Sequence, residues 1–182
     1  MKVIQTPIQD LLIIDPKSHH DDRGFFFEAF QSERYQRLLK KKINFVQDNL
    51  SRSSKNVLRG LHYQIQQPQD KLITVIRGSA FDVAVDIRTE SATFGQWFGI
   101  ILNDENHYQL FIPKGFAHGF CVLSKIVDFH YKCSDYYNAE AEQGILWSDP
   151  SLAINWPLKT PLLSTKDKKY NCLKNIPSEL LF

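Results

Sequence analysis

Residues 72–87 have the sequence LITVIRGSAFDVAVDI. Two apolar runs, Leu72–Ile76 and Ala80–Ile87, flank the turn residues Arg77-Gly78-Ser79, and this spacing predicts a β-hairpin. The second run alternates between large apolar residues and Ala or Asp, which is typical of a strand with one face against a core. One face would carry Phe81, Val83, Val85 and Ile87, and the other Ala80, Asp82, Ala84 and Asp86.

Short runs of the same kind recur along the chain. Further strands are predicted at Leu11–Ile14, Phe25–Phe30, Val57–Gln64, Trp97–Leu102, Gln109–Ile112, Gly119–Leu123, Ile126–Cys133 and Gly144–Trp147. One short helix is predicted in the N-terminal third, at Ser32–Lys42 with Ser32 as its cap, and the C-terminal tail has a loosely helical pattern. Many short strands without βαβ alternation predict an all-β barrel or jelly roll. Its 182 residues suit a single domain, 1–182.

Composition excludes several classes of protein. The net charge is only +2, and the single basic run, Lys40-Lys41-Lys42, is typical of a solvated helix end rather than a nucleic-acid patch. The three cysteines form no C-x-x-C pair, and neither a signal peptide nor a membrane-spanning run is evident. We expect a soluble, cytoplasmic protein with no membrane or nucleic-acid partner.

Val57–Gln64 is an apolar strand interrupted by Arg59 and His62. Burying such groups without partners is costly, and together they offer a grip for an anion and a base that titrates near neutral pH. Strict alternation places them on opposite faces, so a shared site requires a bulge, for which Gly60 is suited. The alternative is that His62 is a hydrogen-bonded core residue.

Three more residues have both a structural and a chemical interpretation. In the strand predicted at Ile126–Cys133, Tyr131 falls on the inward face, where it is either a core tyrosine or a general acid. His130 falls on the other face and points to solvent. Lys71 begins an apolar strand. It is either a lysine whose charged end reaches solvent while its stem packs on the strand, or a cation placed near developing oxyanion charge. Asp167 either completes a helix-capping pattern with Ser164 or hydrogen-bonds His62 and fixes its tautomer.

Arginine and tyrosine residues near turns suggest contacts with a phosphorylated ligand. Arg59 and Arg23 are candidate phosphate clamps, because a guanidinium group matches phosphate oxygens, although Arg23 could equally form a surface ion pair. Tyr136 and Tyr137 could stack on a base or simply pack in their loop. The six histidines lack the spacing of a metal site, and no metal is predicted.

Several motifs in order along the chain resemble the dTDP-4-dehydrorhamnose 3,5-epimerase family, from about Ile4 to Asp167. They are Asp22–Glu28, Phe45–Asn49, Val57–Gln64, Phe81–Arg88, Thr93–Gly95, Ile112–Phe120 and Tyr131–Tyr137. The resemblance implies a cupin-like jelly roll (a double-stranded β-helix) that works without metal or other cofactor. It also implies a homodimer, and the apolar run Ile100-Ile101-Leu102 fits a strand edge that needs cover.

The resemblance also implies roles for individual residues. His62 is expected to be the base, Asp167 its orienting partner, Tyr131 the acid, and Lys71 the cation that stabilises the enolate. Arg59, His118 and Arg23 are expected to bind the diphosphate, and Tyr137 to stack on thymine. Further contacts with the nucleotide sugar are implied for Glu28, Gln47, Asp48, Asn49, Glu142 and Lys166.

The implied substrate is a dTDP-4-keto-6-deoxyhexose. Its C3 and C5 protons lie beside the C4 ketone, so a base and an acid on opposite faces of the sugar can invert both centres. The expected reaction converts dTDP-4-dehydro-6-deoxy-D-glucose to dTDP-4-dehydro-L-rhamnose in dTDP-L-rhamnose biosynthesis. Two alternatives stay open: a single-centre epimerase or ketoisomerase on the same fold, and a non-catalytic sugar-binding module.

Overall fold

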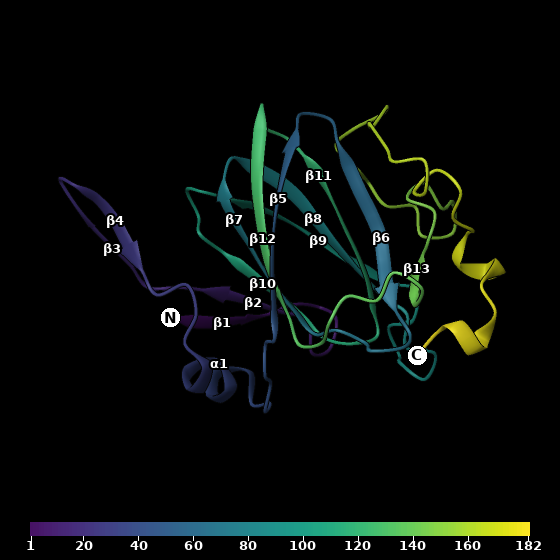
Figure 1. Ribbon diagram of the computed structural model, residues 1–182, viewed down its shortest axis with the longest axis horizontal. Coiled ribbons are helices and arrows are strands. Elements are labelled where there is room, and N and C mark those ends of the chain that lie inside the picture. The colour runs from purple at the N-terminus through teal and green to yellow at the C-terminus, as the bar shows by residue number, and fades with distance from the viewer.

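The computed structural model describes residues 1–182 and consists mainly of two antiparallel β-sheets that pack face to face (Figure 1). The first sheet has the order β1 (Lys2–Gln5), β2 (Leu12–Asp15), β10 (Gln109–Ile112), β7 (Lys71–Arg77), β12 (Ile126–Cys133) and β5 (Gln47–Ser54). The second has the order β13 (Glu142–Gly144), β6 (Leu58–Gln64), β11 (Phe116–Val122), β8 (Ser79–Asp86) and β9 (Trp97–Asn103). The sheets stay separate, so the architecture is a jelly roll and not a closed barrel.

The predicted hairpin between β7 and β8 is wrong, although both strands exist. Strand β7 pairs with β10 and β12, whereas β8 pairs with β11 and β9 in the other sheet. Gly78 turns the chain from one sheet to the other, with a φ of 82°. A side chain there would overlap the carbonyl oxygen of Ile126, so only glycine fits. The turn residues indicate a reversal of the chain, but they do not specify which strands pair.

The N-terminal third adds a helix and a projecting hairpin. Helix α1 (Ser32–Leu39) is capped by Gln31 and not by Ser32, and it ends at Lys40 in the left-handed conformation, before the predicted end at Lys42. Strands β3 (Ser18–Asp21) and β4 (Gly24–Phe27) form an arm that extends away from both sheets (Figure 1). No helix combines the length and the apolar character needed to cross a membrane.

Buried side chains form one core between the sheets and one on each outer face. The predicted alternation in β8 is confirmed, because Ala80 and Ala84 lie between the sheets while Val83 and Val85 pack under the C-terminal tail. That tail contains two short 3₁₀ helices, Leu173–Asn175 and Ser178–Leu180, in agreement with its loosely helical pattern. The third core packs α1 on the first sheet.

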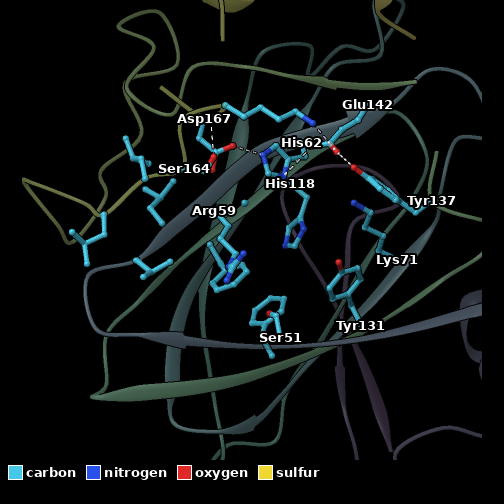
Figure 2. A pocket seen from close by; sticks show the side chains of 18 residues that line it. Ser51, Arg59, His62, Lys71, His118, Tyr131, Tyr137, Glu142, Ser164 and Asp167 are labelled. Atoms are coloured by element: carbon cyan, nitrogen blue, oxygen red, sulfur yellow. Dashed lines mark hydrogen bonds and ion pairs between the residues drawn. The ribbon is translucent and has the colours of Figure 1, made fainter. Parts of the chain in front are cut away.

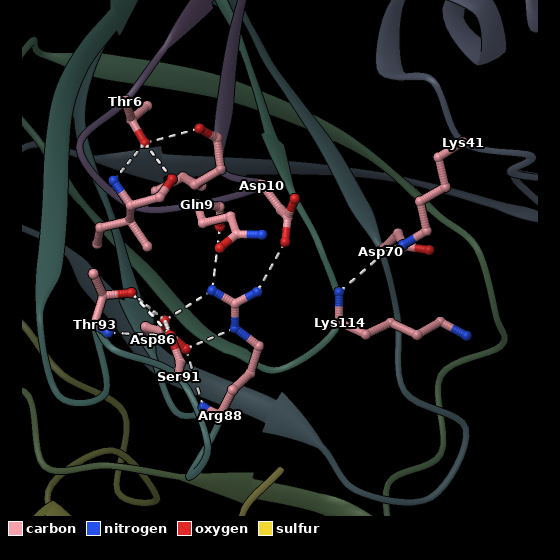
Figure 3. Close-up of polar contacts among 12 residues, drawn as sticks. Thr6, Gln9, Asp10, Lys41, Asp70, Asp86, Arg88, Ser91, Thr93 and Lys114 are labelled. Atoms are coloured by element: carbon pink, nitrogen blue, oxygen red, sulfur yellow. Dashed lines mark hydrogen bonds and ion pairs between the residues drawn. The ribbon is translucent and has the colours of Figure 1, made fainter.

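A buried carboxylate fastens the end of β8 to the loops around it. Asp86 accepts hydrogen bonds from Arg88, Ser91 and Thr93, and Arg88 also reaches Asp10 in an N-terminal loop (Figure 3). Burial acts to raise the pKa of Asp86, but these hydrogen bonds outweigh it and lower the pKa to about 2. The ionised carboxylate therefore stabilises this end of the jelly roll.

Candidate active site

A cavity of about 560 Å³ lies between the two sheets (Figure 2). Its walls come from β5, β6, β7, β11 and β12 and from the segment before the C-terminal 3₁₀ helices. An adjoining cavity of about 290 Å³ shares part of this lining, namely His62, Lys71, Tyr131, Tyr137 and Glu142. Together the two cavities are large enough for a ligand with more than one part.

A bulge in β6 brings Arg59 and His62 to the same cavity. Arg59 pairs with Phe120 and His62 pairs with His118, so three steps along β6 match two along β11. The predicted bulge is therefore confirmed, with Gly60 at φ 123°. A Cβ on Gly60 would lie 2.5 Å from the Cα of Gly119, so a side chain there is excluded.

The predicted contact between His62 and Asp167 is present. The Nε2 of His62 lies 2.6 Å from Oδ1 of Asp167, a buried carboxylate. Burial acts to raise the pKa of Asp167, but hydrogen bonds from His62, Ser164 and the Gly60 amide outweigh it and lower the pKa. The ionised carboxylate accepts the Nε2 proton of His62, which leaves the lone pair of the neutral ring on Nδ1.

Glu142 connects the other side of the His62 ring to the rim of the cavity. One oxygen, Oε1, lies 3.8 Å from Nδ1 of His62, while Oε2 accepts a hydrogen bond from Tyr137 and pairs with Lys166 at 2.9 Å. Burial acts to raise the pKa of Glu142, but the hydrogen bonds from Tyr137 and Lys166 and the charge of Lys166 outweigh it and lower the pKa. A second ionised carboxylate therefore lies beside the ring.

Tyr131 and Lys71 approach the cavity from the sheet opposite His62 (Figure 2). Burial is the main cause that raises the pKa of Tyr131, so the phenol stays protonated. Burial also lowers the pKa of Lys71. Asp70, the residue before it, is buried and accepts hydrogen bonds from the Lys41 side chain and the Lys114 amide, which fixes the start of β7 (Figure 3).

Two further groups in the cavity are held by neighbours. Arg59 donates from Nε to Ser53 Oγ at 3.0 Å, across the gap between the sheets. The Nε2 of His118 lies 3.0 Å from Oδ2 of Asp82, and both residues are buried. Asp82 was not among the predicted site residues, although its signal was available: it is a carboxylate on the inward face of an alternating apolar strand.

Side chains from the predicted polar motifs line the adjoining cavity. Gln47 and Asn49 lie on its wall, and Gln47 accepts a hydrogen bond from the amide of Tyr137 at 2.9 Å. The ring of Tyr137 is half exposed at the rim. These positions leave an aromatic face at the rim, beside two side-chain amides that hydrogen-bond within the protein.

Three predicted ligand contacts lie outside these two cavities. Arg23 is at the tip of the arm, 90% exposed and paired with Asp21. Glu28 follows the arm and pairs with Arg34 at 3.2 Å. Asp48 points to the outer face of β5, where it pairs with Lys132 at 2.7 Å.

No group of three or more His, Cys, Asp or Glu side chains is arranged to bind a metal ion. The cavity instead presents a base on one sheet, and a phenol and an ammonium group on the other. These are the groups needed to move protons beside a carbonyl, and Arg59 adds a free cation for an anion. The fold and the site therefore define a class of protein, jelly-roll enzymes that transfer protons on an anionic substrate.

Comparison with known proteins identifies the family within this class. The family model of dTDP-4-dehydrorhamnose 3,5-epimerase matches residues 5–175. The Shigella flexneri enzyme of that name is 54% identical over 168 residues, covering 92% of this chain and 93% of its own. The chain therefore belongs to the dTDP-4-dehydrorhamnose 3,5-epimerase family.

Two solved structures extend the comparison. The epimerase of Legionella pneumophila, in complex with dTDP-4-keto-L-rhamnose, is 57% identical with a TM-score of 0.97, covering 99% of this chain and 96% of that one. A 3'-monoepimerase from Streptomyces bikiniensis, in complex with dTDP-quinovose, is 31% identical with a TM-score of 0.88, covering 96% of this chain and 88% of that one. The same architecture therefore occurs in enzymes named for two centres and for one.

Proposed function

We propose that the protein inverts C3 and C5 of dTDP-4-dehydro-6-deoxy-D-glucose to give dTDP-4-dehydro-L-rhamnose, a step of dTDP-L-rhamnose biosynthesis. The observation that carries this proposal is the position of His62 and Tyr131 on opposite sheets, across one cavity (Figure 2). A sugar ring bound between the sheets has one face toward the base and the other toward the acid. Inversion of a carbon centre requires that arrangement, because the proton must leave and return on different faces.

Proton removal is the first half of each inversion. The Nδ1 of His62 takes the proton from C5 or C3, and the electron pair moves into an enolate with its charge on O4. Asp167 accepts the Nε2 proton in a hydrogen bond and stabilises the imidazolium that forms. Lys71 supplies positive charge to O4 from the opposite sheet, where the charge develops.

Proton return completes the inversion. Tyr131 donates its phenolic proton to the carbon from the opposite face, and the C4 carbonyl re-forms. Its raised pKa keeps the proton in place until the enolate is formed. The same pair of groups acts at both carbons, since C3 and C5 lie on either side of the ketone. Between the two inversions, and again after the second, His62 loses its extra proton to solvent and the Tyr131 phenolate takes one up from solvent.

The remaining groups bind the nucleotide. Arg59 and His118 are assigned to the diphosphate, because a guanidinium and an imidazole suit phosphate oxygens. Tyr137 is assigned to the thymine, on which its half-exposed ring can stack. Gln47, Asn49, Glu142 and Lys166 are assigned to polar groups of the nucleotide sugar.

A homodimer is part of the proposal. The arm extends away from its own cavity and bears Arg23, with Phe25 and Phe26 more than half exposed (Figure 1). Ile101 is also exposed on the edge strand β9. We assign the arm to the second copy, so that Arg23 and the neighbouring Glu28 act at the partner's cavity. A cytoplasmic location, expected from the sequence, belongs to the same proposal.

Incubation with dTDP-4-keto-6-deoxyglucose in deuterated water tests the reaction. We expect deuterium at both C3 and C5 and a product with both centres inverted, observed by NMR. Deuterium at one carbon only would replace the proposal by the single-centre reaction, for which the Streptomyces bikiniensis structure gives a precedent on this fold. Binding of the nucleotide sugar without any exchange would leave a sugar-binding module.

A further inference from the structure

Tyr170 contacts His62 but does not line the cavity. Its ring meets the His62 ring edge to face, with centroids 5.8 Å apart and planes at 66°. Its hydroxyl donates to Oε1 of Glu142 at 3.4 Å, the same oxygen that lies nearest Nδ1 of His62. Tyr170 thus touches the base and one of its carboxylate neighbours from outside the ligand space.

The Tyr170 ring rests on bare backbone. Gly144 in β13 is the residue that pairs with His62 across the sheet. A Cβ on Gly144 would overlap the Tyr170 ring, so the ring fills the space that a side chain would occupy. The space left by the absence of a side chain at Gly144, beside His62, is called the seat of Tyr170 below.

This seat anchors the segment that carries Asp167. Upstream, the segment is fastened at Leu162, whose amide donates to the Asn56 carbonyl at 2.8 Å. Downstream, the next backbone contact with a strand region is the hydrogen bond from the Leu146 amide to the Asn171 carbonyl at 2.9 Å. Between them, the backbone of residues 164–169 forms only local turns, and the contacts outside the segment are those of Asp167 with His62 and Gly60 and the ion pair of Lys166 with Glu142. Lys166 is half exposed at the rim, so Tyr170 is the side chain that holds this segment by packing directly against the His62 ring and the Gly144 backbone.

We propose that Tyr170 is a positioning residue: its ring, seated on Gly144, aligns Asp167 with Nε2 of His62. Through this alignment it selects the ring tautomer that leaves the lone pair on Nδ1. The inference rests on the proposed function, in which Nδ1 is the base. The relevant group is the ring and not the hydroxyl, because the ring makes both the Gly144 and the His62 contacts.

Two substitutions separate ring from hydroxyl. Tyr170→Phe keeps the seated ring, and we expect kcat within about three-fold of wild type. Tyr170→Ala removes the ring, and we expect kcat to fall by about 10–100-fold, the effect of a small misalignment, with KM and dTDP affinity changed by less than about two-fold. Asn171→Ala is the matched control on the same segment, since that side chain is exposed, and it should retain wild-type kcat.

NMR of ¹⁵N-labelled histidine gives a readout that a purely structural role would not change. In wild type and Tyr170→Phe, His62 should show the tautomer protonated on Nε2, assigned by its loss in His62→Ala. In Tyr170→Ala the tautomer protonated on Nδ1 should gain population. An unchanged tautomer together with unchanged kcat would overturn the inference.

Gly144→Ala approaches the same contact from the other side. Its new methyl group displaces the ring, so it should lower kcat and shift the tautomer with Tyr170 still present. In a Tyr170→Ala background it should add little, because the contact is already lost. Fully additive losses of kcat in the double variant would show that the contact between Gly144 and the Tyr170 ring does not position the ring. The tautomer is measured without turnover, so an inactive wild type would remove the proposed reaction while the positioning role could still be scored.

Discussion

Arg59, Lys71 and Lys166 are the lysine and arginine side chains that line the cavity, and only Lys166 pairs with a carboxylate. An unpaired cation facing a cavity is available for an anionic ligand, whereas a paired one must first give up its partner. This difference separates the role of Arg59 from that of an ordinary surface arginine.

Replacement of Arg59 should lower the affinity of the protein for the nucleotide. Arg59→Ala is expected to reduce the affinity for dTDP by about 1.5–3 kcal/mol, the range for charge-assisted hydrogen bonds. Isothermal titration calorimetry measures the change. Arg37→Ala, an exposed arginine on α1, is the control and should bind dTDP as wild type does. Equal affinities in a folded Arg59→Ala protein would make Arg59 a structural residue.

Lys71 should set the alkaline limit of activity. In the proposed mechanism the ammonium form of Lys71 stabilises the enolate, and burial lowers the pKa of this group below the usual 10.5. Activity is therefore present below this lowered pKa and lost as the pH rises through it. Tyr131 has a raised pKa and stays protonated over the same range, so it does not cause the first loss.

The variant Lys71→Arg tests this assignment, because a guanidinium group keeps its charge at high pH. Each profile of kcat against pH is normalised to its own maximum. We expect the alkaline fall of Lys71→Arg to begin at higher pH than that of wild type. Coincident falls would assign the limit to another group.

Sequence reasoning found the titratable residues that line the cavity and the pairing of His62 with Asp167, but it missed Asp82, the partner of His118. His62 and Arg59 were identified because they interrupt an apolar strand, and Tyr131 because it falls on the inward face of one. Asp82 carried a similar signal, yet its partner His118 is 36 residues away, and only the pairing of β8 with β11 brings them together. Tyr170 gave no signal, since its role depends on the absence of a side chain at Gly144.

Not every strand around the cavity shows hydrophobic alternation in its sequence. Strand β5 illustrates this, because its sequence is polar on both faces and no strand was predicted for its exact span. Gln47, Asn49 and Ser51 point inward, where they line cavities and not an apolar core. A strand beside a polar ligand site therefore lacks the hydrophobic alternation that identifies strands in sequence.

The bulge in β6 can be tested at Gly60. Gly60→Ala places a methyl group 2.5 Å from the Gly119 Cα at a φ of 123°, so backbone atoms must move. Gly95→Ala is the matched control, because Gly95 has a φ of 75° but only a distant contact. We expect Gly95→Ala to lose about 1 kcal/mol of unfolding free energy and Gly60→Ala at least about 2 kcal/mol more. Urea titration measures both.

The same variants should differ in activity. Gly60→Ala shifts Arg59 relative to His62, so kcat should fall as well, while Gly95→Ala retains it. Equal stability and equal kcat in the two variants would mean that the bulge does not depend on glycine.

At the scale of the whole molecule, His62 and Tyr131 lie on different sheets because the chain crosses repeatedly from one sheet to the other, as it does at Gly78. The jelly roll was predictable as a class, from short alternating strands and from the family motifs. The pairing of the strands was not predictable. The same turn residues occur whether the strand after the turn pairs with the strand before it or joins the other sheet.

The proposed dimer has a test that identifies the role of the arm. Light scattering should give twice the 21.2 kDa mass of the chain. Arg23→Ala and His62→Ala proteins are then mixed and allowed to exchange subunits. If Arg23 acts at the partner's cavity, each mixed dimer has one intact site, and equal mixing restores about a quarter of wild-type activity. A monomer, or no restoration above the separate variants, would contradict the assignment.

Deuterium exchange in variants of the two opposed groups tests the central claim most directly. The claim is that His62 removes the proton and Tyr131 returns it on the other face, and NMR of substrate and product in deuterated water follows both events. His62→Ala should show no deuterium at C3 or C5. Tyr131→Phe should exchange deuterium into recovered substrate while forming little inverted product, since His62 can still make the enolate. Asp167→Asn should fall between wild type and His62→Ala, because it keeps the geometry but favours the wrong tautomer. Inversion of both centres by Tyr131→Phe at a near wild-type rate would contradict the account and make Tyr131 a core tyrosine.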